Sequence, residues 1–179
     1  MDIVFPKPGT EKSFVQMAER LGIDHLILAY PMPGNRVELP PIKTQVKLSV
    51  GQIVTTKTRK FFPGLKILTE PDNPRAAFEQ SKADIICNLE LQNKPDFIHH
   101  RASGFNHVMS AIAAKRGKKL GINFSNLLSD NGTLTGRVRQ NIKLARKAKV
   151  EIVIFSGATT QHDMRSEDLL RSVSILLGC

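Results

Sequence analysis

Short apolar runs alternate along this chain with longer stretches in which apolar residues recur every three or four positions. The first pattern predicts buried strands, and the second predicts amphipathic helices. We expect eight strands, over residues 2–4, 25–29, 45–56, 65–69, 84–89, 97–99, 119–123 and 151–155. We expect five helices, over residues 11–21, 75–82, 105–116, 133–149 and 166–177. Strands that alternate with helices in this order predict a parallel sheet with right-handed crossovers.

The length of the chain decides between the parallel folds. A barrel of eight strand and helix units typically needs about 250 residues, whereas this chain has 179. The proline-rich connection at residues 31–41 also stands where a crossover helix is expected. We therefore predict an α/β fold with one domain over residues 1–179, a compact TIM-barrel-like parallel barrel with short or missing helices. An open doubly wound sheet is the alternative, but no GxGxxG motif follows the first strand.

The positive charge is concentrated in one third of the sequence. Residues 91–149 hold 12 Lys and Arg against Asp96 and Asp130, a surplus of +10 that equals the formal net charge of the whole chain. A basic surface confined in this way favours a polyanionic partner, because neutralising phosphates releases condensed counterions. Nucleic acid is the first candidate. A solvated face on an ordinary enzyme is the alternative.

The basic residues fall into two clusters, of which the helix at 133–149 carries the larger. One arc of this helix holds Leu134, Val138, Ile142 and Ala145, so it is expected to pack on the barrel. The opposite arc carries Arg139, Lys143, Arg146 and Lys147. The second cluster, Lys115, Arg116, Lys118 and Lys119, lies at a helix end, where cations also interact favourably with the helix dipole.

Catalytic and metal-binding motifs are weak in this sequence. His99 and His100 are neighbours in an extended segment, so their side chains point to opposite faces and do not easily share one ion. Ser156 follows a strand, but Ile154 stands where a nucleophile elbow needs glycine. The two cysteines have no CxxC spacing. We expect no catalytic residue and no metal site, and a stand-alone barrel metallohydrolase with a basic surface remains the alternative.

We expect neither a leader nor a membrane span from these residues. The first six residues lack both a basic leader and a long apolar run. No later stretch approaches the roughly 18 apolar residues of a membrane span. We expect a cytoplasmic protein without membrane contact.

Several segments of the second half share a family resemblance. Residues 101–113 read R-A-S-G-F-N-H-V-M-S-A-I-A, and residues 121–128 read G-I-N-F-S-N-L-L. An arginine-rich helical segment begins at Arg137, and residues 156–158 and 163–169 read S-G-A and D-M-R-S-E-D-L. In this order, they resemble archaeal ribonuclease P protein component 3, whose signature includes R-x-S-G-[LF]-N-H-V. The resemblance covers about residues 84–179 and is less clear in the N-terminal half.

The resemblance implies a barrel of the polymerase and histidinol phosphatase-like type. It implies an RNA-binding, non-catalytic subunit of ribonuclease P, the endoribonuclease that removes the 5′ leader of precursor tRNA. The implied partners are ribonuclease P RNA and ribonuclease P protein component 2, with precursor tRNA and other ribonuclease P proteins as further candidates. No cofactor is expected in the protein, because magnesium would be bound by the partner RNA. Related barrel metallophosphoesterases carry an HxH pair after the first strand, where this chain has Asp2-Ile3-Val4-Phe5.

The expected site residues form two sets. RNA contact is expected from Arg101, Lys115, Arg116, Lys118, Arg139, Lys143, Arg146 and Lys147. A structural role, or contact with RNA or a protein partner, is expected for the signature residues Ser103, Asn106, His107, Asn123, Ser156 and Arg165. Within the signature, we expect Ser103 to cap the helix, while Asn106 and His107 bond neighbouring loops.

Overall fold

Seven parallel strands form one curved sheet in the computed structural model, which describes residues 1–31, 39, 41–128 and 132–179. The strands lie side by side in chain order. They are β1 (Asp2–Val4), β2 (His25–Pro31), β3 (Lys47–Ile53), β4 (Lys66–Leu68), β5 (Ile85–Ile86), β6 (Lys119–Asn123) and β7 (Ile152–Phe155). Because every pair is parallel, each connection must cross the length of the sheet, and the predicted α/β barrel architecture is confirmed.

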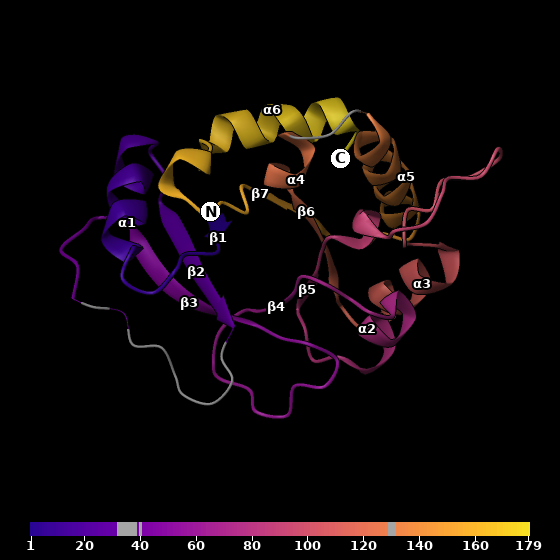
Figure 1. Ribbon diagram of the computed structural model, residues 1–179, viewed down its shortest axis with the longest axis horizontal. Helices are drawn as coiled ribbons and strands as arrows, with labels where there is room; N and C mark the ends of the chain where they lie inside the picture. Colours follow the sequence, from indigo (N-terminus) through magenta and orange to yellow (C-terminus); the bar gives the residue numbers. More distant parts are fainter. Residues whose placement is uncertain (32–38, 40, 129–131) are drawn as a thin grey trace.

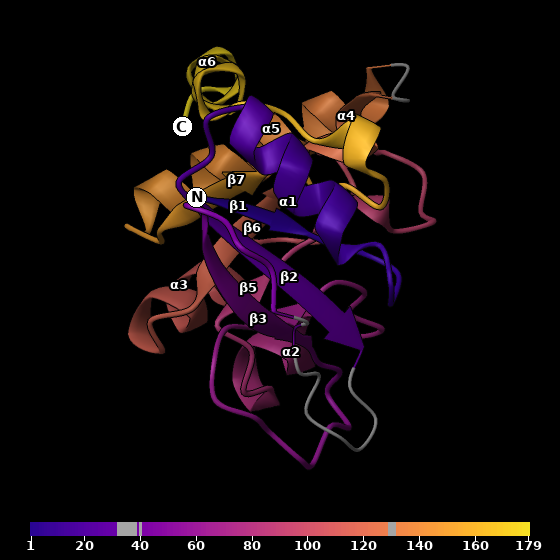
Figure 2. The same cartoon turned by 90° about the vertical axis from the view of Figure 1, so that its left-hand side faces the viewer.

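Helices cover the outer side of the sheet, as both views show (Figures 1 and 2). They are α1 (Glu11–Arg20), α2 (Pro74–Gln80), α3 (His107–Lys115), α4 (Phe124–Leu128), α5 (Thr133–Lys147) and α6 (Glu167–Leu177), with short 3-10 turns η1 (Leu89–Leu91) and η2 (Gln161–Asp163). The sequence pattern does not predict α4. In Figure 1, α6 runs across the top of the molecule from the side of α1 to the side of α5. No helix among the described residues is long and apolar enough to cross a membrane.

The barrel is shortened at the connection between β3 and β4. Residues 54–65 contain no helix, and the buried side chain of Gln52 holds them instead. Its Nε2 donates to the carbonyl of Lys60 at 2.9 Å, and its Oε1 accepts from the backbone N–H of Phe62 at 3.0 Å. The expected loss of at least one crossover helix is thereby confirmed. The proline-rich connection at 31–41, where we expected this loss, lies mostly outside the described residues.

The expected strand at residues 97–99 is wrong. These residues form a turn in which the N–H of Phe97 donates to the carbonyl of His100 at 2.9 Å. The apolar Phe97 and Ile98 resemble a short strand in sequence, but no neighbouring strand supplies a ladder for them. The described residues therefore form seven strands rather than eight.

Alternating strand residues fill the inside of the barrel. Ile3, Ile27, Ile67, Ile85, Cys87 and Phe155 belong to this interior cluster. Gly121 of β6 makes room for it, because a Cβ at that position would lie 2.7 Å from the Ile85 side chain and 2.8 Å from Cys87 Cβ. The other strand face packs against the helices, with Leu68, Ile86, Leu120 and Ile122 against the buried sides of α3 and α5.

The first strand and the end of the last strand are joined by backbone hydrogen bonds. The N–H of Gly157 donates to the carbonyl of Ile3 at 3.1 Å, and the N–H of Phe5 donates to the carbonyl of Ala158 at 2.8 Å. The fully buried Asp2 carboxylate reinforces this junction, because it accepts from the N–H of Ser156 at 2.7 Å and from Ser156 Oγ at 2.5 Å. Burial raises the pKa of Asp2, although the donors from Ser156 and Ile3 oppose that shift. The barrel is nearly closed by these contacts.

Ser156→Ala tests the junction between the two ends of the sheet. The substitution removes one donor from a buried carboxylate, so the free energy of unfolding should fall by about 1–3 kcal/mol. Ser172→Ala is a matched control, because Ser172 is exposed on α6 and donates to the carbonyl of Asp168 within the same helix. Its effect should stay within about 0.5 kcal/mol. Urea unfolding measures both, and equal midpoints for the two variants would contradict the role of Ser156.

Candidate nucleic-acid interface

The outer face of α5 carries the larger basic cluster as expected. Val138, Ile142 and Ala145 are buried against the sheet and the neighbouring helices. The opposite face exposes Arg139, Lys143, Arg146 and Lys147. Cations four residues apart stand about 6 Å apart along a helix axis, so the four form one continuous row, which we call the α5 basic row.

A groove runs beside the α5 basic row. Its volume is about 740 Å³, and it lies between α5 and the end of α6. All four cations line it, together with Gln140, Ile142, Leu177 and Gly178. The lining of the groove is therefore partly apolar and partly cationic.

The α5 basic row is barely neutralised by the protein. Among the described residues, no carboxylate lies within ion-pair distance of any of its four cations. Arg146 donates to the carbonyl of Gly178 at 2.7 Å, which leaves its charge uncompensated. Like charges four residues apart cost a few tenths of a kcal/mol per pair in isolation. A bound polyanion would reverse that repulsion.

The second basic cluster is smaller in the structure than expected. Lys115 and Arg116 are exposed at the end of α3, whereas Lys118 is buried. The Lys118 ammonium donates to the carbonyls of Ser81 and Ala83, each at 2.8 Å. Burial lowers the pKa of Lys118. The structure gives Lys118 a structural role, because its hydrogen bonds fasten the end of α2 to the start of β6. Contact of Lys118 with RNA stays an untested prediction.

Arg137 of α5 is buried and holds the loop that precedes α3. Its Nε donates to Asp96 Oδ1 at 2.8 Å, and its Nη1 donates to the carbonyls of Glu90 and Gln92 at 3.0 and 2.9 Å. Its Nη2 donates to the carbonyl of Lys94 at 2.6 Å. One guanidinium thus fixes the backbone of residues 90–96. We call residues 92–104 the projecting loop, since this pink segment protrudes at the right of Figure 1.

The signature segment at 101–107 and the arginine-rich helix contact one another. Gln140 Nε2 donates to Ser103 Oγ at 2.8 Å and to the carbonyl of Arg101 at 3.0 Å. Asn141 Nδ2 donates to the carbonyl of Ser103 at 2.9 Å. Gly104 has a φ of +72°, and a Cβ there would lie 2.1 Å from the carbonyl oxygen of Leu89. The two signature segments therefore form one packed unit.

The expectation that Ser103 caps the helix of this signature is wrong, because Asn106 is the cap. The helix α3 begins at His107, and Asn106 is its N-cap, with Oδ1 accepting from the N–H of Met109 at 2.9 Å. Ser103 lies three residues earlier and is buried against Gln140. His107 is exposed in the first turn of the helix. Arg101 is also exposed, and its Nη1 contacts Asp96 at 3.3 Å, so its guanidinium remains open to solvent on one side.

The remaining signature residues hold loops at the carboxyl ends of the strands. Asn123 is buried, and its Oδ1 accepts from the N–H of Ser125 at 3.1 Å. Ser156 binds Asp2, as described for the barrel junction. Arg165 donates to the carbonyls of His162 and Met164 at 2.9 and 2.8 Å. These contacts support a structural role, while contact with RNA or a protein partner stays a prediction.

Two further pockets lie at the two ends of the barrel. One of about 540 Å³ opens at the carboxyl ends of the strands and is lined by Glu70, Asn88, Asn123, Asn126 and Asp163, among others. In the described part of the chain, no three His, Cys, Asp or Glu side chains are placed to hold a metal ion. The absence of catalytic residues and of a metal site stays a prediction.

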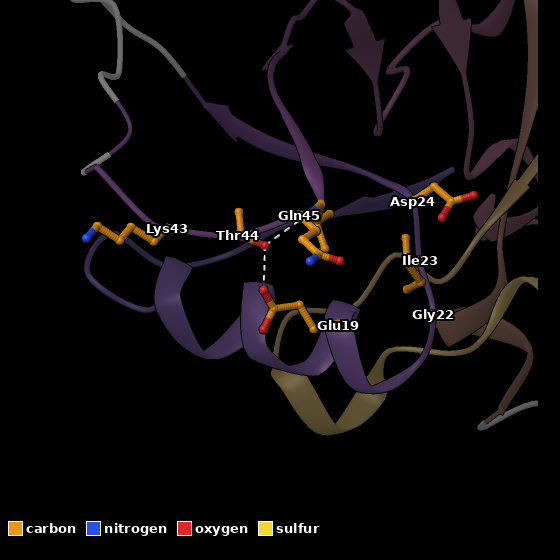
Figure 3. A pocket seen from close by; sticks show the side chains of 8 residues that line it. Glu19, Gly22, Ile23, Asp24, Lys43, Thr44 and Gln45 are labelled. Atoms are coloured by element: carbon orange, nitrogen blue, oxygen red, sulfur yellow. Dashed lines mark hydrogen bonds between the residues drawn. The ribbon is translucent and has the colours of Figure 1, made fainter.

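The pocket at the opposite end measures about 680 Å³ (Figure 3). Two of its polar side chains bond one another, since Thr44 Oγ1 donates to Glu19 Oε1 at 2.6 Å, and Thr44 Oγ1 also accepts from the backbone N–H of Val46 at 3.0 Å. It lies far from α5 in the fold, at the start of β2 and β3. We do not assign it to the basic surface.

Comparison with known proteins confirms the family resemblance. No family model matches the chain. The chain is similar to ribonuclease P protein component 3 of Methanosarcina acetivorans, with 36% identity over 96 residues, and of Methanocaldococcus jannaschii, with 31% identity over 102 residues. These alignments cover 51% and 55% of this chain, but only 37% and 41% of the two relatives. The matched region is thus about two fifths of each relative's length.

The fold is also that of a solved protein. A chain in a cryo-EM structure of archaeal ribonuclease P with mature tRNA superimposes with a TM-score of 0.72 and 20% sequence identity. The match covers 98% of this chain and 82% of that one. Nearly the whole chain therefore follows the same barrel.

Glu90 makes the stability of this region depend on pH. Burial raises the pKa of Glu90 to about 7 from an ordinary value of 4.5, and its Oε1 has no hydrogen-bond partner among the described residues. The folded state then binds this proton more tightly than the unfolded state, so the contribution of Glu90 to stability is greatest on the acid side and falls as pH rises from about 4.5 to 7. The fall amounts to about 3 kcal/mol. Glu90→Gln should flatten it in urea unfolding measured across this range, and an unchanged slope would contradict the assignment.

Proposed function

We propose that this chain is an RNA-binding, non-catalytic subunit of ribonuclease P, the endoribonuclease that removes the 5′ leader of precursor tRNA. The observation that carries the proposal is the α5 basic row beside a groove, four exposed cations for which the described residues supply no carboxylate partner. Two similarities support it, the sequence likeness to proteins named ribonuclease P protein component 3 and the fold shared with a chain of archaeal ribonuclease P.

The geometry of α5 suits a phosphate backbone. Its buried face fixes the helix on the barrel, so the four side chains start from a rigid scaffold. Each side-chain cation that displaces a counterion from an RNA phosphate contributes to the affinity for RNA, and this contribution does not depend on base sequence. Lys115 and Arg116 at the end of α3, and the open side of Arg101, extend the same set of expected RNA contacts.

The proposed partners follow from the same assignment. They are ribonuclease P RNA and ribonuclease P protein component 2, with precursor tRNA and other ribonuclease P proteins as further candidates, in the cytoplasm. An exposed apolar patch on α6 supports contact with another protein, because Ile175 and Leu176 are 70% and 78% exposed. In this proposal, magnesium is bound by the RNA and supplies the hydrolytic chemistry, while the protein holds the RNA in place.

Reconstitution tests the proposed function directly. Mixed with ribonuclease P RNA and component 2, the protein should raise the rate of precursor-tRNA cleavage. Alone with precursor tRNA and magnesium, it should cleave no faster than buffer. The alternative, a stand-alone metallohydrolase, predicts the opposite result. Robust cleavage by RNA-free protein that is abolished by His99→Ala or His100→Ala would overturn our proposal.

A fourfold substitution tests the α5 basic row. Changing Arg139, Lys143, Arg146 and Lys147 to Gln should flatten the slope of log affinity against log salt for duplex RNA by about 3 to 4 units. The loss should be similar for unrelated duplexes, because phosphate contacts do not read sequence. Stability should change by no more than about 0.5 kcal/mol per exposed position.

The control for this test removes the same charge elsewhere. Lys12 on α1, Lys47 in β3, and Lys43 and Lys57, which flank β3 in the chain, are all exposed. In Figure 1, α1 and β3 lie on the side of the molecule away from α5. Their fourfold change to Gln should leave the salt slope close to that of the unaltered protein. If both variants lose the same slope, the α5 basic row acts only as part of the net charge.

A further inference from the structure

The tip of the projecting loop presents two stacked rings to solvent. The rings of Phe97 and His100 have centroids 4.7 Å apart and planes inclined by 18°. Phe97 is 60% exposed, and its neighbour Ile98 is 97% exposed. Aromatic surface placed in water in this way gains nothing for folding. A binding role explains why the rings are held there.

The loop holds these rings in a fixed arrangement. Arg137 binds the carbonyls of Gln92 and Lys94 and the carboxylate of Asp96 on one side of the tip. On the other side, Gln140 bonds both the N–H and the carbonyl of Arg101, at 3.1 and 3.0 Å. The tip is thus braced at both ends by one helix. A ligand that binds there does not have to order the loop, which lowers the entropic cost of binding.

A groove opens beside the stacked rings. Its volume is about 640 Å³, and both Phe97 and His100 line it. Its lining is mixed, with the cations Arg75, Lys94 and Arg101 and the amides Gln92, Asn106 and Gln140 beside apolar side chains that include Phe105, Met109 and Leu144. A nucleotide needs both kinds of surface, because its base is planar and apolar on its faces while its phosphate is anionic.

Charge decides between a nucleotide and an apolar protein segment. Asp96 is the single acidic residue in 91–107, and its carboxylate is shared by Arg137 and Arg101. Lys94 has no ion-pair partner among the residues that the structure describes. A cationic site with a π surface favours a base with its phosphate, because bases stack on aromatic rings and the phosphate meets the cation.

We propose that this groove binds one unpaired nucleotide of the RNA, with its base stacked on the Phe97–His100 pair and its phosphate beside Lys94 and Arg101. The inference rests on the proposed function, since it names a second contact of the same RNA. The α5 basic row then follows paired RNA, and the projecting loop receives a base that is unstacked from it. Because Arg137 and Gln140 belong to α5, one helix positions both contacts.

A fluorescent single strand tests this inference. The probe is an eight-nucleotide oligouridylate that carries one 2-aminopurine, whose emission falls when it stacks on an aromatic ring. The unaltered protein should bind the probe and quench it. Phe97→Leu keeps an apolar side chain but removes the ring, so affinity should fall by about 5- to 100-fold, with loss of the quenching. The salt slope should be unchanged, because the phosphate contacts remain.

Ile98→Ala is the matched control, since Ile98 is the more exposed neighbour but has no ring to stack. Its affinity and quenching should match those of the unaltered protein. Retention of affinity and quenching in Phe97→Leu would overturn the inference. A second result would also overturn it. If both Phe97→Leu and Ile98→Ala weaken the binding of purified component 2 and leave probe binding unaffected, the tip is a protein contact.

Failure of this inference can be told apart from failure of the proposed function. Duplex RNA binding that depends on the α5 basic row, without binding of the single strand, would overturn the nucleotide site alone. Salt-independent binding of both RNAs, or no binding of either, would overturn the proposed function together with the inference.

Discussion

The buried guanidinium of Arg137 is the contact on which the arrangement of the projecting loop depends. It donates to three backbone carbonyls and to Asp96, so it satisfies a stretch of loop backbone that has no strand partner. A lysine would supply a single ammonium at that point, whereas the planar guanidinium spreads its donors over several acceptors. Without this anchor, the projecting loop would have to be ordered by its ligand.

The helix α5 therefore serves the core and the surface at once. Its inner residues pack on the barrel, Arg137 and Gln140 hold the projecting loop, and the α5 basic row faces solvent. This division depends on the barrel remaining nearly closed, because Asp2 and Ser156 join its two ends beneath the same layer of helices. Stability and the proposed RNA contact thus belong to different faces of the same elements.

The sequence predicts the strands and the α5 basic row well, because both follow from a local period of apolar residues. β1 and β6 begin and end where the pattern places them. The burial of the Lys118 ammonium was not predictable, since its hydrogen-bond partners are the carbonyls of Ser81 and Ala83, which lie far away in the chain. The choice of Asn106 over Ser103 as the cap was not predictable either, because both residue types cap helices. Ser103 is instead held by its hydrogen bond with Gln140, and Asn106 caps the helix. The projecting loop was missed because the partners of Arg137 are backbone carbonyls 43 to 47 residues away in the chain, which no local period marks.

Lysine acylation footprinting tests most directly whether this surface holds the RNA. The protein is labelled with and without ribonuclease P RNA, and the modified lysines are quantified by mass spectrometry. The account predicts that RNA protects Lys143 and Lys147, that Lys12 and Lys43 react equally in both samples, and that the buried Lys118 reacts in neither. Protection of Lys12 and Lys43 with Lys143 and Lys147 left reactive would contradict it.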